Sequence, residues 1–101
     1  MVIYVDLDNT LCETIGTDYE NSQPITKRIE YINKYFDQGH SITIYTARGS
    51  LSKIDYYELT KNQLESWGVK YNSLIVGEKP VYDLLIDDKA LSDIEFFKSI
   101  E

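Results

Sequence analysis

Four short apolar runs alternate along the chain with longer segments of helical periodicity. The runs cover residues 2–5, 42–45, 74–76 and 84–86, and each is nearly continuous in apolar residues. Strands that are buried on both faces of a sheet have this pattern, whereas strands with one solvated face alternate between apolar and polar positions. Each run therefore predicts a buried β-strand.

The segment between the first two runs predicts a helix. Apolar side chains recur at spacings of three and four residues from position 25 to position 36. Pro24 suits the first helical position, and Gly39 supplies a C-terminal stop. This pattern is typical of an amphipathic helix that packs one face on a sheet.

Two further helices follow the second and the fourth runs. The first is predicted over residues 54–67, with Ser52 as its N-cap and Gly68 as its stop. Its inner face is expected to hold Tyr57, Thr60, Leu64 and Trp67. A last short helix is predicted over residues 92–99.

The order of these elements predicts the fold class. Strands alternate with helices, and a helix that joins two parallel strands makes a right-handed crossover. We expect a three-layer, Rossmann-like α/β fold in which a parallel sheet of about four strands is flanked by helices on both sides. The link over residues 77–83 is too short for a full crossover helix, so the last strand crosses by a loop or a single turn. At 101 residues, the segment 1–101 is expected to form one domain.

Polar side chains stand where the predicted strands end. In chain order they are Asp6 and Asp8 after the first run, Thr46 at the second, Lys79 after the third, and Asp87 and Asp88 at the fourth. In open parallel α/β sheets, ligands bind beyond the carboxyl ends of the strands. The sequence therefore predicts a polar site at this edge of the sheet.

The acidic residues of this set predict a metal ion. Carboxylates packed together without a counter-charge would have to stay partly protonated. Mg²⁺ prefers oxygen ligands and keeps several waters, so it fits an all-carboxylate site, which we expect to include Asp6, Asp8, Asp87 and Asp88. No His or Cys pair has the spacing of zinc ligands, and the lone histidine, His40, lies in a predicted turn.

Such a site can catalyse reactions of phosphate esters. Asp6 can attack phosphorus as a nucleophile, as in the aspartyl-phosphate enzymes. Asp8 can protonate the leaving oxygen and later remove a proton from water. Thr46 offers a hydroxyl donor and Lys79 a positive charge to the transferring phosphoryl group. We therefore expect a phosphatase whose substrate is a small phosphorylated molecule.

Composition narrows the partners and the compartment. The net charge of −7 argues against broad binding to nucleic acids or anionic membranes, and no apolar run approaches the ~20 residues of a membrane span. The first residues have no basic lead, and two acids interrupt their apolar stretch, which is unlike a signal peptide. A single cysteine, Cys12, excludes an internal disulfide and suits a reducing cytoplasm, where we expect the protein to act.

The strand-end residues also match a known family. The string DLDNTL from Asp6 resembles the first motif of the haloacid dehalogenase-like superfamily, and Thr46 in TAR is similar to the second. Lys79 in GEKP falls where the third motif has its lysine, and the acidic pair in IDDKA resembles the fourth. Four ordered motifs are a specific signal, whereas a lone DxDxT would not be.

The resemblance implies a role for each residue. Asp6 would be the nucleophile and a metal ligand, and the backbone carbonyl of Asp8 would also bind the metal. Asp87 would ligate Mg²⁺ directly, and Asp88 would assist through water or by holding Lys79. Superfamily members that cleave carbon–halogen or carbon–phosphorus bonds have no acid at the position of Asp8, so its presence favours phosphate-ester hydrolysis or phosphoryl transfer.

The resemblance also implies an open site. Most family members insert a cap domain after the first or the second motif, but neither interval here has room for one. Residues 12–23 would form the flap that the family places over the site, and a second copy of the chain can close an open site as a homodimer. More narrowly, TARG, WGVKY and IDDKA are similar to small bacterial proteins associated with capsule and surface-polysaccharide synthesis.

Some alternatives remain open at this stage. Arg48 either contacts a second anionic group of the substrate or is a solvated loop residue. A phospho-receiver domain needs an acceptor aspartate on a middle strand, but the middle runs end in Thr46 and Gly77. A catalytically silent module that binds a metal or a partner on the same fold is the other alternative.

Overall fold

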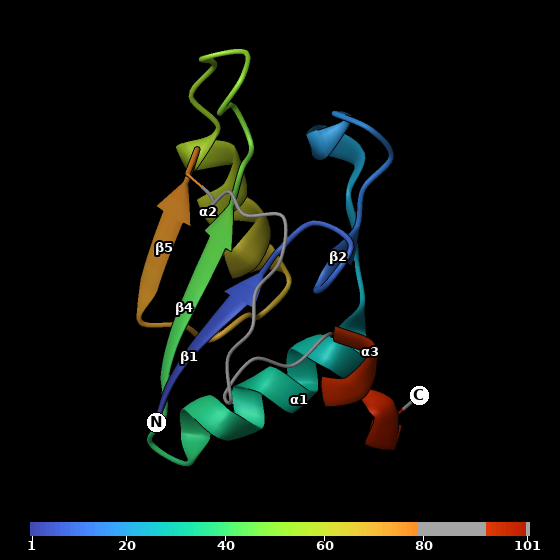
Figure 1. The fold of residues 1–101 in the computed structure, drawn as a ribbon, viewed down its shortest axis with the longest axis vertical. Coiled ribbons are helices and arrows are strands. Elements are labelled where there is room, and N and C mark those ends of the chain that lie inside the picture. Colours follow the sequence, from blue (N-terminus) through green and yellow to red (C-terminus); the bar gives the residue numbers. More distant parts are fainter. Residues whose placement is uncertain (79–92, 101) are drawn as a thin grey trace.

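A parallel three-stranded sheet forms the centre of the computed structural model, which describes residues 1–78 and 93–100 (Figure 1). The strands are β1 (Val2–Asp6), β4 (Ser41–Thr46) and β5 (Ser73–Val76), in the order β1-β4-β5. They confirm the strands predicted from the first three apolar runs. The fourth run, over residues 84–86, lies outside the described residues.

The other elements connect these strands or follow them. They are β2 (Cys12–Glu13), the 3₁₀ turn η1 (Tyr19–Asn21), β3 (Gln23–Pro24), α1 (Thr26–Asp37), α2 (Tyr57–Ser66), α3 (Asp93–Phe96) and the 3₁₀ turn η2 (Lys98–Ile100). Helix α1 connects β1 to β4, and α2 connects β4 to β5, so each crossover joins parallel neighbours. This confirms an α/β fold whose parallel sheet is flanked by helices.

The core lies between one face of the sheet and the crossover helices. Register pairs Val5 with Ile44, and both are buried. They belong to one apolar cluster with Ile29 and Ile32 of α1 and with Leu64 of α2. Every one of these residues lies in or next to a predicted apolar pattern. Coverage of the opposite face by further helices stays a prediction.

The first helix begins later than predicted. Pro24 is not its first residue, because Pro24 pairs with Cys12 across the antiparallel strands β2 and β3. Ile25 donates its amide to the carbonyl oxygen of Leu11 and keeps a non-helical backbone, so α1 begins at Thr26. A strand pairing that residue spacing does not reveal therefore takes the place of the proline-initiated turn.

The second helix also begins later than predicted, at Tyr57 instead of residue 54. Ser52 does not cap it, since the Ser52 hydroxyl accepts the amide of Ile54 in the preceding loop. The carboxylate of Asp55 accepts the amide of Tyr57 at 2.9 Å instead. The Tyr57 side chain is 41% exposed and does not contribute to the inner face, whereas Thr60 and Leu64 are fully buried as predicted.

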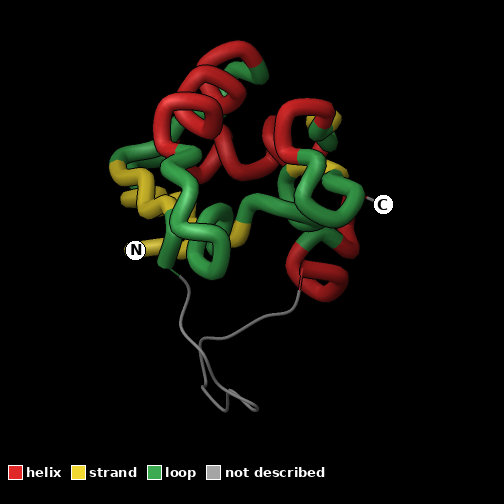
Figure 2. Tube along the Cα trace, turned by 90° about the horizontal axis from the view of Figure 1, so that it is seen from above, coloured by secondary structure: helices red, strands yellow, loops and turns green. Residues whose placement is uncertain are grey.

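The connections leave no room for a cap domain. Between β1 and β4 the chain forms only the β2–β3 pair, η1 and α1, and between β4 and β5 only a loop and α2. Figure 2 looks down on the end of the molecule to which the strand arrows of Figure 1 point, where loop segments gather. In the described ranges, no helix has both the length and the apolar character for a membrane crossing.

Candidate active site

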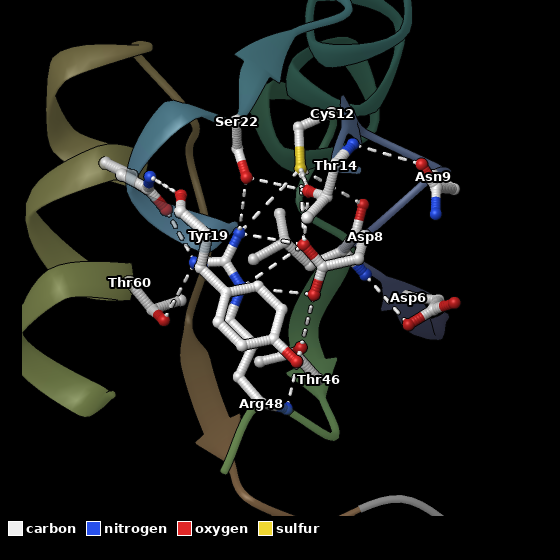
Figure 3. Close-up of polar contacts among 12 residues, drawn as sticks. Asp6, Asp8, Asn9, Cys12, Thr14, Tyr19, Ser22, Thr46, Arg48 and Thr60 are labelled. Carbon is white, nitrogen blue, oxygen red and sulfur yellow. Dashed lines mark hydrogen bonds and ion pairs between the residues drawn. The ribbon is translucent and has the colours of Figure 1, made fainter. Parts of the chain in front are cut away.

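A tight turn after β1 separates the two acidic side chains. The carbonyl oxygen of Leu7 accepts the amides of Thr10, Leu11 and Cys12. Asn9 has a φ of 60°, a left-handed conformation that asparagine tolerates better than most residues. The turn lets Asp6 and Asp8 leave the strand end in different directions, as Figure 3 shows.

Asp8 forms an ion pair with Arg48 inside the protein (Figure 3). The Nη2 atom of Arg48 lies 2.8 Å from Oδ1 of Asp8, and its Nε atom lies 3.1 Å from Oδ2. The Arg48 side chain is completely buried, and that of Asp8 is 20% exposed. Two donors on one carboxylate form a two-pronged contact that fixes its orientation, which the single point charge of a lysine cannot do.

Arg48 has further partners on two other segments. Its Nη1 atom donates to Gln63 Oε1 at 2.5 Å and to Thr60 Oγ1 at 3.2 Å, both on α2. Its Nη2 atom donates to Ser22 Oγ at 3.3 Å, and its guanidinium carbon lies 4.8 Å from the ring centre of Tyr19. The guanidinium therefore joins the acidic turn, α2 and the flap.

Two threonine hydroxyls also donate to Asp8. Thr46 Oγ1 lies 2.8 Å from Oδ2, and Thr14 Oγ1 lies 2.7 Å from Oδ1. Burial alone would raise the pKa of Asp8, but the hydrogen bonds from Arg48 and the threonines, with the positive charge of Arg48, lower it below its ordinary value. Asp8 is therefore a carboxylate in this arrangement.

This pKa shift predicts how stability depends on pH in the absence of divalent metal. The folded-state pKa of Asp8 lies below its unfolded value of about 3.9, so its contribution is complete above that value and is lost as the pH falls through the folded-state pKa. Urea unfolding with a chelator present gives the free energy of unfolding of wild type and of Asp8→Asn at each pH. The difference between these two free energies should shrink as the pH falls from about 5 to about 2. A difference that stays constant over that interval would contradict the lowered pKa.

Asp6 occupies a different environment from Asp8. It ends β1, is half-buried, and its Oδ1 accepts the amide of Leu7 at 3.0 Å. In Figure 3 its carboxylate is directed away from the Asp8–Arg48 contact. The two acids, two residues apart, thus differ in their partners and in their direction.

The other predicted site residues fall into two groups. Lys79, Asp87 and Asp88 lie outside the described residues, so their roles stay predictions. Within residues 1–78 and 93–100 no three acidic, histidine or cysteine side chains form a group that could hold a metal. The Asp6 carboxylate at the end of β1 is an oxygen ligand, a type that suits Mg²⁺ better than zinc. Metal binding by Asp6 and by the backbone carbonyl of Asp8 stays a prediction.

Arg48 is neither solvated nor directed at the exterior. The alternative of a solvated loop residue is wrong, because the side chain is fully buried. Substrate contact by Arg48 stays a prediction. Thr46 is likewise buried with its hydroxyl on Asp8, so its contact with a phosphoryl group also stays a prediction. Cys12 is buried, and burial raises the pKa of its thiol, which suits an unreactive side chain.

Several residues of this network were not predicted from the sequence. Gln63, Ser22 and Thr14 carry no motif that would single them out. Thr60 did carry a signal, because a polar residue on the inner face of a predicted helix requires a buried hydrogen-bond partner. The Nη1 atom of Arg48 is that partner.

The fold and the turn after β1 define a class of protein: a capless α/β domain with two acids and a threonine at the ends of neighbouring parallel strands. The model of the haloacid dehalogenase-like hydrolase family matches residues 3–99, and the chain belongs to this family. A crystal structure of a target from Vibrio cholerae is similar, with a TM-score of 0.80 and 32% identity over 94% of this chain and 85% of that chain. The comparison with curated proteins gave no significant match.

Proposed function

We propose that this hydrolase is a Mg²⁺-dependent phosphomonoesterase in which Asp6 is the nucleophile and Asp8 is the general acid/base. The observation that carries the proposal is the contrast between the two acids. Asp8 accepts hydrogen bonds from the side chains of Arg48, Thr46 and Thr14, whereas Asp6 lies at the end of β1 and is directed elsewhere. Pairs of carboxylates in unlike environments are typical of an acid or base beside a nucleophile.

Two steps complete the proposed reaction. In the first, an oxygen of Asp6 forms a bond to phosphorus while the ester oxygen leaves and takes a proton from Asp8. In the second, Asp8 removes a proton from water, which attacks phosphorus, releases inorganic phosphate and restores the Asp6 carboxylate. The second step needs Asp8 as a carboxylate, which is the form that Arg48 and the threonines favour. The first step needs its acid form, and an anionic phosphoryl group beside Asp8 would raise its pKa.

A magnesium ion would be held by Asp6 and the carbonyl oxygen of Asp8, together with Asp87 and Asp88. When bound, it would screen the repulsion between the nucleophilic carboxylate and the anionic substrate. Asp6 keeps its orientation through the amide of Leu7. Lys79 would hold the phosphoryl group as a point charge.

We propose that the substrate is a small phosphorylated molecule such as a sugar phosphate or a polysaccharide precursor. Without a cap domain, the flap over residues 12–23 and the loop over residues 47–56 are, within residues 1–78, the segments that would meet the substrate outside the phosphoryl group. The narrower resemblance to proteins of capsule synthesis supports this substrate class. A second copy of the chain is a candidate to close the open side.

The proposal predicts activity and stability that depend on Mg²⁺. The purified protein should hydrolyse an aryl phosphate with millimolar Mg²⁺ and lose that activity in a chelator. The same assay with Ca²⁺ in place of Mg²⁺ is the comparison. Because a ligand that binds only the folded state stabilises it, Mg²⁺ at ten times its dissociation constant should raise the melting temperature by about 7 °C.

The two readouts separate possible failures. Hydrolysis that is unchanged in the chelator would contradict the metal requirement. A Mg²⁺-induced rise in melting temperature without hydrolysis of any phosphorylated metabolite in a panel would favour the silent metal-binding module over the enzyme.

A further inference from the structure

The flap and Asp8 share the same buried side chain. We propose that Arg48 is a positioning residue that couples docking of the flap on α2 to the orientation of Asp8. Asp8 is then aimed for proton transfer only while the flap is docked. The catalytic consequence rests on the proposed function, but the coupling itself is a property of the fold and is testable without activity.

The first argument is the reach of the guanidinium. Its Nε and Nη2 atoms hold Asp8, and the same Nη2 atom donates to Ser22 Oγ in the flap. Its Nη1 atom donates to Gln63 on α2. A planar guanidinium offers five donors in a rigid fork, so a shift of one partner changes the direction of the others.

The second argument is that Gln63 connects Arg48 to the flap a second time. Its Oε1 accepts from Arg48, and its Nε2 donates to the carbonyl oxygen of Tyr19 at 2.6 Å. The ring of Tyr19 covers the guanidinium and meets the ring of Tyr56 edge-on, with 4.9 Å between centres. The flap is thus docked through both the backbone and the side chain of Tyr19.

The third argument is electrostatic. With the flap docked, the Arg48 side chain is excluded from solvent, and its attraction to Asp8 acts in a low-dielectric surrounding. If the flap lifts, Arg48 loses Ser22 and the Tyr19 ring, water reaches the ion pair, and the attraction weakens. Docking of the flap and orientation of Asp8 therefore favour each other, and such a coupling is reciprocal.

Kinetics of Gln63→Met test the coupling in one direction. Gln63 bonds to Arg48 and Tyr19, so the variant removes one of the contacts that dock the flap and leaves the side chains of Asp6, Asp8 and Arg48 in place. We expect kcat for an aryl phosphate to fall about tenfold with KM changed less than about twofold. Gln38→Met, the same replacement at an exposed position beyond α1, should keep the wild-type kcat.

The Arg48→Lys background tests whether Arg48 carries the effect of Gln63 on kcat. Lysine keeps the charge but loses the fork, so Gln63→Met should have little further effect on kcat in this background. An equal loss in both backgrounds would mean that Gln63 acts without Arg48. If Gln63→Met fails to fold, Tyr19→Leu, which removes the ring over the guanidinium, takes its place. Its kcat is then compared in the wild-type and in the Arg48→Lys background.

Hydrogen exchange tests the reciprocal direction. Asp8→Asn removes the charge on which Arg48 is held, so the amide of Ser22, which donates to the carbonyl oxygen of Tyr19, should exchange about tenfold faster. The increase should disappear in the Arg48→Lys background. Asp37→Asn, at an exposed position of α1, is the matched control and should leave this amide unchanged.

The outcomes distinguish the coupling from the proposed function. Faster exchange in Gln63→Met with wild-type kcat would overturn the coupling while the phosphatase assignment stands. If Asp6→Asn is as active as wild type, the proposed function fails, and the exchange measurement alone decides: unchanged exchange in Asp8→Asn would overturn the coupling.

Discussion

Asp6→Asn is expected to lower kcat for an aryl phosphate by at least about a thousandfold, because removal of a covalent nucleophile removes the step that it performs. Asparagine has nearly the same shape and keeps an oxygen that can accept the amide of Leu7. The turn after β1 should therefore persist, so the loss would be chemical. The measurement is steady-state hydrolysis with saturating Mg²⁺, with circular dichroism to verify folding.

The matched control for this variant is Asp37→Asn. Asp37 is exposed on α1 and pairs with Lys70 at the surface, far along the chain from the site, so its rate should stay within about twofold of wild type, as is usual for exposed ion pairs. Equal rates for Asp6→Asn and wild type would remove the nucleophile assignment. Together with a Mg²⁺-induced stabilisation, that result would favour the silent module.

The described strands of the sheet could be predicted from the sequence because a buried strand is a nearly continuous apolar run, and such a run can be recognised without knowing its contacts. Val5 and Ile44 occupy continuous apolar runs, and both are buried opposite each other in the structure. Asp6, Asp8 and Thr46 could be predicted as a group for the same reason, since they lie at or just beyond the ends of those strands.

The helix starts could not be predicted because single contacts in the folded structure decide them. Asp55, and not Ser52, accepts the first amide of α2, and both are plausible capping residues by type. At α1, pairing of Pro24 with Cys12 decides the start, and that contact joins residues twelve positions apart. Boundaries depend on which of several similar partners is close in space.

The partner of Asp8 was the largest part of the site that the sequence did not reveal. Arg48 lies forty residues from Asp8 in the chain, and the motif that accounts for Thr46, two residues earlier, says nothing about Arg48. From the residue type alone, an arginine beside a predicted phosphate site is interpreted as a substrate contact. Only the burial of Arg48 and its bonds to Thr60 and Gln63 indicate an internal role.

Arg48→Met is expected to cause the largest loss of stability among single changes at the site. Removing one partner of a buried ion pair costs about 3–5 kcal/mol, because the remaining charge has no partner. Asp8 is 20% exposed, so water offsets part of that cost and we expect the lower end of the range. For a domain of this size, about 3 kcal/mol lowers the melting temperature by about 15 °C.

A double variant separates the ion pair from simple loss of packing. In Asp8→Asn with Arg48→Met neither charge remains, so the melting temperature should lie above the value expected if the two single losses were additive. Calorimetry of wild type, both single variants and the double variant closes the cycle, in a chelator so that metal binding does not contribute. Additive losses would mean that Arg48 stabilises the fold through Thr60, Gln63 and the flap and not through Asp8. The size of this coupling measures the interaction between Asp8 and Arg48, whose guanidinium also bonds to Ser22 of the flap and to Gln63 of α2.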